Sequence, residues 1–251
     1  MKRAVLTMIS PDITLIDDAG DSTCYLVAGN DKAVLIDTAN GKENLKEIIC
    51  ALTDLPLVVI NTHGHCDHIY GNLFFDEAYI HDADLPVMAE HFARPEAVKL
   101  IEQTGLKPCP TKSIRQGDVI DLGGKKLEIY EVPGHTPGSI VLLDRDERVL
   151  FTGDALNGHL WMQLEESTGI PSLIRSIKAL EPIRGAFDYI LTGHAKGLED
   201  ASLIDELLSG AQELLDGKTE NDSDYEWFCG IARRHDYGTH GRCIVYDEKK
   251  M

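Results

Sequence analysis

The 251-residue sequence lacks the features of a membrane-spanning or secreted protein. Its longest strictly apolar stretches, such as residues 55–60, are far shorter than the ~20 residues that a transmembrane helix needs. Lys2 and Arg3 resemble the start of a signal peptide, but the apolar run that follows them ends at Ile9, short of the usual ~7 to 15 residues. We therefore expect a cytoplasmic protein with no membrane partner.

Basic residues are scarce, because 24 Lys and Arg stand against 42 Asp and Glu, which gives a formal net charge of −18. Such a surface repels phosphate backbones, whose neutralisation drives most nucleic-acid affinity. We therefore expect no nucleic-acid partner. The six cysteines are scattered without a CxxC pair, and a chain of this length does not need disulfide bonds to fold, so we expect free thiols.

Several catalytic motifs are also missing. The sequence contains no GxSxG nucleophile elbow, no phosphate-binding GxxxxGK[ST] loop and no GxGxxG that opens a helix. These absences leave no support for a serine hydrolase, a nucleotide-phosphate site or a dinucleotide site.

What the sequence does contain is a mixed α and β rhythm without a repeat or linker, which indicates one domain over residues 1–251. Apolar or alternating runs predict strands at 13–16, 23–28, 33–37, 57–61, 78–81, 126–132, 139–143, 148–152 and 187–191. Helical spacing predicts helices at 44–52, 85–92, 96–103, 172–180 and 201–215. This order favours an α/β fold in which sheets pack face to face with helices outside them.

The most informative segment is THGHCDH at residues 62–68, directly after an expected strand. A strand that ends in a tight glycine-containing turn can project His63 and His65 to the same side, with Asp67 and His68 following at the start of a helix. Imidazole and carboxylate groups are ligands that Zn²⁺ and Fe²⁺ accept. The alternative is a solvated histidine-rich turn, since such tracts are common.

Three later segments favour the metal site. His135, Asp154 and His194 each follow a strand-like run, and a glycine precedes each of them. A glycine there allows the close backbone approach that the rim of a buried site requires. Each residue alone is more simply a satisfied surface or core side chain, but the whole set is hard to explain in that way.

On these residues the chain resembles the metallo-β-lactamase-fold metallohydrolases, whose pattern is HxHxDH followed by separate His, Asp and His residues. The resemblance extends over about residues 24–194. It implies an αβ/βα four-layer sandwich of two mixed β-sheets, with a dinuclear metal site at their loop ends. Carried over by position, His63, His65 and His135 would hold the first metal, Asp67, His68 and His194 the second, and Asp154 would bridge both.

The resemblance implies two divalent transition metals, with Zn²⁺ as the first choice and Fe or Mn as alternatives. A bridging hydroxide would then be the nucleophile, with Asp67 and His68 as the catalytic residues and Asp67 orienting the attack. The expected reaction is cleavage of a small-molecule ester-type bond in a lactone, thioester or phosphodiester. The sequence does not decide the substrate, the native metal or the oligomeric state.

For substrate contacts, the segment after Asp154 offers an apolar wall that leans over the metals. We expect it to comprise Asn157, His159, Trp161 and Met162, with residues 157–159 in a loop. The alternative is that Trp161 and Met162 pack a helix against the sandwich. Tyr70 and the tail segment 237–240 are further candidates that face or only cap the site. Cys66 lies inside the metal motif, but strand alternation points its thiol away from the cluster.

Related branches of the family are separated by simple features. A glyoxalase II-like thioesterase shares the motif but carries a basic C-terminal helical domain, whereas the tail after His194 is short and acidic here. The acidic balance argues against the transfer-RNA nucleases. Two alternatives remain open: a mononuclear iron oxidoreductase of the persulfide dioxygenase type, and a catalytically silent metal-binding scaffold.

Overall fold

The first sheet contains seven strands that follow one another in chain order. The computed structural model describes residues 4–228, 230–238 and 241–251. The strands are β1 (Val5–Met8), β2 (Ile13–Asp17), β3 (Thr23–Ala28), β4 (Ala33–Ile36), β5 (Leu57–Ile60), β6 (Ala78–Ile80) and β7 (Thr111–Ser113). The early strands form antiparallel hairpins, whereas β4, β5, β6 and β7 pair in parallel. The parallel pair β4–β5 needs a crossover, and helix α1 (Leu45–Leu52) provides it.

The second sheet is built from the middle of the chain. Its order is β14 (Glu199–Asp200), β13 (Tyr189–Thr192), β11 (Val149–Gly153), β10 (Ile140–Asp144), β9 (Lys126–Glu131) and β8 (Val119–Asp121). Every residue of β10 and β11 is buried, as expected for central strands covered on both faces.

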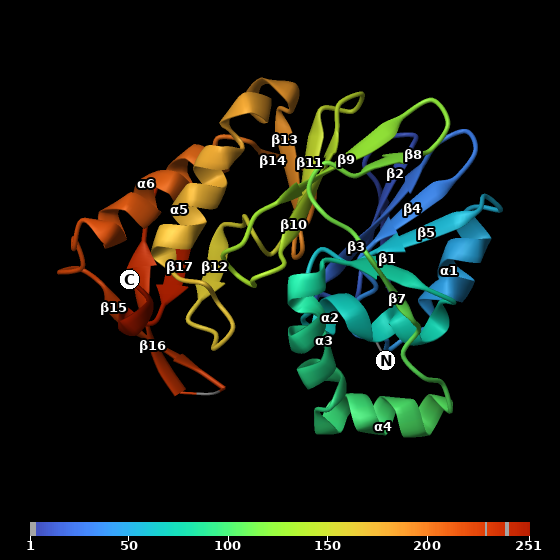
Figure 1. The fold of residues 1–251 in the computed structure, drawn as a ribbon, viewed down its shortest axis with the longest axis horizontal. Helices are drawn as coiled ribbons and strands as arrows, with labels where there is room; N and C mark the ends of the chain where they lie inside the picture. The colour runs from blue at the N-terminus through green and yellow to red at the C-terminus, as the bar shows by residue number, and fades with distance from the viewer. Residues whose placement is uncertain (1–3, 229, 239–240) are drawn as a thin grey trace.

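The two sheets face each other across a shared hydrophobic core. Side chains of both sheets meet there, among them Ile36, Ile60, Leu142 and Phe151. Helix α1 covers the outer face of the first sheet. Helices α5 (Ile170–Ala179) and α6 (Leu203–Leu215) cover the outer face of the second, as Figure 1 shows. The expected α/β sandwich is therefore confirmed.

A third sheet, which the sequence did not predict, follows beyond α5 and α6 (Figure 1). Its order is β12 (His159–Met162), β17 (Cys243–Tyr246), β16 (Gly230–Asp236) and β15 (Ser223–Trp227). Leu160, Met162, Ile244 and Tyr246 on one face join the hydrophobic cluster of α5 and α6. We expected residues 157–159 to form a loop, and that was wrong at His159, which begins β12 and pairs in parallel with β17.

The remaining elements are short and lie around the sandwich. They are α2 (Cys66–Ile69), α3 (Leu85–Phe92), α4 (Pro95–Thr104) and four 3₁₀ helices, η1 (Tyr70–Phe74), η2 (Asp82–Asp84), η3 (Glu181–Ala186) and η4 (Glu248–Lys250). Among the described residues, no helix has the length and apolar character needed to cross a membrane.

Candidate metal centre

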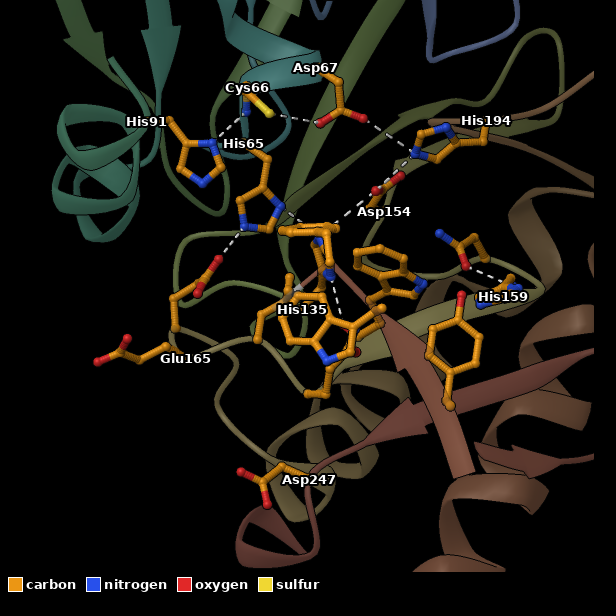
Figure 2. A pocket seen from close by; sticks show the side chains of 18 of the residues that line it. His65, Cys66, Asp67, His91, His135, Asp154, His159, Glu165, His194 and Asp247 are labelled. Atoms are coloured by element: carbon orange, nitrogen blue, oxygen red, sulfur yellow. Dashed lines mark hydrogen bonds and ion pairs between the residues drawn. The ribbon is translucent and has the colours of Figure 1, made fainter. Parts of the chain in front are cut away.

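Four segments of the chain bring the candidate ligands together. His63 and His65 lie in the turn after β5, and Asp67 and His68 lie on α2 directly behind it. The other three come from the second sheet and are found after β9, β11 and β13: His135, Asp154 and His194. Figure 2 shows Asp67, Asp154 and His194 pointing toward one another next to His65 and His135.

The seven side chains form groups with metal-binding geometry. The ligand atoms of His63, His65 and His135 lie within 4.8 Å of one another, and so do those of Asp67, His68 and His194. Asp154 forms a group with His63 and His68 at the same spacing. The structure therefore brings together all seven residues that the sequence singled out, in the grouping that the resemblance implied.

Asp154 lies between the two groups. Its Oδ2 is 3.2 Å from His194 Nε2 and 3.6 Å from His68 Nε2 on one side. On the other side it is 3.8 Å from His135 Nε2. Burial alone would raise the pKa of Asp154, but His194 and His68 lower it well below its ordinary value. An ionised carboxylate in this position can reach two cations at once.

The donor set fits divalent metal ions. Three buried atoms that face the centre have no hydrogen-bond partner, namely His63 Nε2, His68 Nε2 and Asp154 Oδ1. Burial also lowers the pKa of His63 well below its usual value and that of His135 to about 4, so both rings are neutral at pH 7. Neutral imidazole is the form that binds metal, and an unpaired buried polar atom is costly without a partner.

Asp37 orients two of these histidines, and the sequence did not reveal it. Its Oδ2 accepts hydrogen bonds from His68 Nδ1 at 2.9 Å and from Thr62 Oγ1 at 2.8 Å. Thr62 Oγ1 in turn lies 3.0 Å from His63 Nδ1. These contacts leave Nε2 of both rings free to face the centre, the arrangement that partners of metal-bound histidine usually provide.

The other three histidines are held by groups outside the motif. The Nδ1 of His135 donates to the carbonyl of Trp161 at 2.7 Å, and the Nδ1 of His194 donates to the carbonyl of Asp21 at 2.7 Å. His65 instead uses Nε2, which lies 2.5 Å from Glu166 Oε1, so its Nδ1 faces the centre. No local sequence pattern could identify these partners, because they come from distant loops.

Two glycines are required by close packing at the centre. A Cβ on Gly193 would lie 2.3 Å from Asp154 Oδ1 and 2.6 Å from His68 Cε1. Gly153 has a φ of +49°, and a Cβ there would lie 2.3 Å from Thr62 Oγ1. The glycines before Asp154 and His194 therefore permit the close approach that we expected from the sequence.

A buried carboxylate joins two of the ligand loops. Asp84 is fully buried and accepts hydrogen bonds from the backbone N–H of Gly64 at 2.7 Å and of Gly138 at 2.6 Å. It also accepts one from Thr136 Oγ1 at 2.8 Å. The turn that carries His63 and His65 is thereby fixed relative to the loop that carries His135.

The centre opens into a cavity of about 1060 Å³. Three expected substrate contacts line it, Asn157, His159 and Trp161. The other two do not. Met162 has no exposed surface and packs in the core, because it lies on the opposite face of β12 from Trp161. Tyr70 is buried, and its hydroxyl donates to the carbonyl of His91 at 2.8 Å.

The sequence missed several residues of the cavity wall. Tyr225 and Trp227 from β15 and Phe228 directly after it line the cavity, together with His91 and Lys250. Of the tail segment 237–240, Thr239 and His240 lie outside the described residues. Cys66 also lines the cavity, and burial raises the pKa of its thiol to about 11, so it is protonated at neutral pH and a poor ligand.

Comparisons with known proteins agree with this geometry. The sequence model described as "Metallo-beta-lactamase superfamily" matches residues 17–208. The chain is 30% identical over 201 residues to the acyl-coenzyme A thioesterase MBLAC2 of Homo sapiens, covering 68% of this chain and 71% of that protein. It is 30% identical over 152 residues to the hydroxyacylglutathione hydrolase GloC of Haemophilus influenzae, covering 55% of this chain and 68% of that protein.

Among solved structures, the fold is similar to a metallo-beta-lactamase from Pontibacter korlensis. The TM-score is 0.65 at 22% sequence identity, covering 83% of this chain and 99% of that chain.

Proposed function

The chain belongs to the metallo-beta-lactamase superfamily, and we propose that it hydrolyses small-molecule thioesters with two divalent metal ions, Zn²⁺ being the first choice. One observation supports the proposal: two groups of three candidate ligands, with Asp154 between them, adjoin a cavity of about 1060 Å³. A cavity of this size suits a small organic substrate and not a polymer.

The candidate ligands support hydrolysis at a defined place. Bound together at this spacing, two cations would supply an activated water and polarise the scissile carbonyl. We assign Asp67 the role of orienting the attacking water, because its carboxylate is 27% exposed to the cavity and its Oδ2 lies 3.5 Å from His68 Nε2. His68, in contrast, is fully buried, so we assign it to holding the second cation.

A thioester is favoured among the three bond types that the sequence left open. Both curated relatives are named as enzymes that cleave thioesters of a carrier thiol. Water adds to the carbonyl carbon, the C–S bond breaks, and the proton lost by the water leaves with the thiolate as a thiol. A thiol with an ordinary pKa near 8.5 leaves without a strong acid, which suits a cavity where His91 is neutral because burial lowers its pKa to about 3.

A substrate panel tests this function. The zinc-loaded protein is assayed with lactones, thioesters and phosphodiesters, and thiol release is followed with a thiol-reactive dye. We expect the highest kcat/KM on a thioester, with Asp154→Ala losing metal and activity together and Tyr189→Leu on β13 unchanged. Hydrolysis of only lactones or phosphodiesters would contradict the thioester assignment.

Elemental analysis of the same preparation separates the alternatives. Two metal ions per chain support the dinuclear hydrolase. One iron per chain with oxygen consumption on a persulfide would favour the dioxygenase reading instead.

A further inference from the structure

The cavity has an aromatic wall on the side formed by the third sheet. In β12, Trp161 pairs with Val245 of β17, and in β15 Tyr225 pairs with Ala232 of β16. Because Val245 pairs with Arg234, two residues from Ala232, these side chains share the face opposite α5 and α6. The larger aromatic rings of this face rest on small buried residues, Ala232, Cys243 and Val245.

The aromatic rings form a continuous surface. The centroid of the Trp161 ring is 5.7 Å from that of Trp227 and 6.4 Å from that of Tyr225. Phe228 extends the surface at 4.8 Å from Trp227, with 76% of its own surface exposed. We call Trp161, Tyr225, Trp227 and Phe228 the aromatic wall. Because these rings are partly exposed inside a cavity, covering them with an apolar ligand is favourable.

The aromatic wall is connected to the candidate metal centre. The carbonyl of Trp161 accepts the hydrogen bond from His135 Nδ1 at 2.7 Å, so a residue of the wall is in direct contact with a candidate ligand. If the carbonyl carbon of a thioester is bound at the metals, the acyl group attached to it can therefore reach the aromatic wall.

The charged groups around the cavity argue against a strongly anionic substrate. Among the described lining residues the acidic side chains outside the candidate ligands are Glu90, Glu165, Glu166, Glu199 and Asp247, and Figure 2 labels two of them. The described lysine and arginine in the lining are Lys250 and Arg94. Lys250 Nζ donates to the backbone carbonyls of Leu164, Glu165 and Ser167, which uses its three donors. Arg94 Nη2 donates to Glu90 Oε1 at 2.9 Å.

We propose that the enzyme recognises the apolar acyl group of its thioester on the aromatic wall, and that it favours a thiol arm with little negative charge over a phosphorylated one. This rests on the proposed thioesterase function. In the described lining, acidic side chains outnumber Lys250 and Arg94, so the phosphates of coenzyme A would be repelled by the excess of carboxylates, whereas a neutral arm meets no repulsion.

Kinetics test both parts of the proposal. Acetyl and octanoyl thioesters of coenzyme A and of N-acetylcysteamine, a neutral thiol, are compared with the zinc-loaded enzyme. We expect kcat/KM on the neutral arm to rise at least about 30-fold from acetyl to octanoyl, since each buried methylene contributes up to about fourfold. Salt should raise kcat/KM for the coenzyme A esters and leave the neutral esters unchanged, because it screens repulsion.

Variants of the wall give the matched comparison. Trp227→Ala should cut the octanoyl-to-acetyl ratio of kcat/KM at least about fivefold, while Tyr189→Leu on the exposed surface of β13 should keep the ratio of the parent enzyme. A ratio near one in the parent enzyme, an unchanged ratio in Trp227→Ala, or a preference for coenzyme A esters at low salt would overturn the proposal.

Binding keeps the inference testable if no thioester is hydrolysed. The chain has two tryptophans, and both are in the aromatic wall, so their fluorescence reports on this surface directly. Titration with S-octyl-N-acetylcysteamine, a non-hydrolysable thioether, should change the emission, whereas S-methyl-N-acetylcysteamine should not. Absence of hydrolysis with such binding would refute the proposed function alone; absence of binding would refute the wall as an acyl site.

Discussion

Asp37 illustrates how one residue outside the motif organises the candidate metal centre. It has a φ of +62°, in the region that side chains other than glycine rarely adopt, at a cost of about 1 to 3 kcal/mol. Its carboxylate accepts three hydrogen bonds that offset this cost, from the Thr62 N–H and hydroxyl and from His68 Nδ1. A polar residue at the end of a strand is common, so the sequence could not distinguish Asp37 without its partners.

The substitution Asp37→Asn tests this role. An amide has one acceptor oxygen, so its NH₂ group would face either the Thr62 N–H or both the Thr62 hydroxyl and His68 Nδ1. Either orientation leaves a donor unpaired, and the second also removes the acceptor that fixes the His68 tautomer. We expect metal affinity and kcat/KM to fall by about 10- to 100-fold while the fold persists. The metal affinity is measured by titration in competition with a chromogenic chelator. Asp121→Asn, a substitution at an exposed residue, is the control. Equal affinities in the two variants would contradict the orienting role.

Gly193→Ala tests the packing of the centre. The added methyl group would lie within 2.6 Å of both Asp154 and His68, so these side chains must move. We expect the metal content to fall below that of the parent protein. Gly197→Ala, where nothing lies within 4 Å of an added Cβ, should keep its metal. An unchanged metal content in Gly193→Ala would show that the centre tolerates this displacement.

At the scale of elements, the sequence predicts the sandwich better than the third sheet. Strands such as β10 and β11 are apolar throughout because both faces are buried, so composition alone reveals them. In contrast, β15 and β16 are polar and mostly exposed, with segments such as Arg233 to Asp236 that resemble a loop. They pair with each other and with nearby β17 as consecutive antiparallel strands, but the sheet also needs β12 from residues 159–162, a distant pairing that no local pattern contains.

Because the strand β12 was not predicted, the sequence analysis placed both Trp161 and Met162 at the cavity, although only Trp161 lines it. Trp161 and Met162 are adjacent, and without knowing that they lie on a strand the sequence could not assign them to opposite faces. Trp161 faces the cavity, whereas Met162 packs between the third sheet and the helices.

Alanine substitutions at these neighbours should therefore separate stability from catalysis. Met162→Ala removes a fully buried side chain, so we expect a loss of about 2 to 5 kcal/mol and normal kinetic constants per folded molecule. Trp161→Ala should instead change kcat/KM with a smaller effect on the melting temperature. Thermal melts and kinetic assays on both variants test this prediction. A large loss of stability with unchanged kcat/KM in Trp161→Ala would show that Trp161 has a packing role.

On the scale of the whole molecule, the candidate ligands come from loops of both sheets. His63 to His68 follow the first sheet, and His135, Asp154 and His194 follow the second. Metal ions held by these residues would connect the two halves of the sandwich, and they would stabilise the folded state because the unfolded chain has no preformed site. The sequence could predict this convergence because each segment that carries candidate ligands lies shortly after the end of a strand.

Removing the metal ions should show how much they stabilise the folded protein. We expect two metal ions per chain by elemental analysis, and a chelator should lower the melting temperature of the parent protein by several degrees, since about 1 kcal/mol shifts it by roughly 2 to 4 °C. Asp154→Ala should show a smaller shift. At most one tightly bound metal under metal-replete conditions would exclude the dinuclear site and leave the fold intact.

The pairing of β12 with β17 has a consequence for how the protein is made. All seven candidate ligands precede residue 195, but β12 obtains its parallel neighbour only from residues 243–246. A growing chain leaves the ribosome N-terminus first, and such a long-range pairing forms late. The part of the sandwich that carries the candidate ligands can therefore assemble first during translation, while the surface that would hold a substrate is completed only after residues 243–246 have been made.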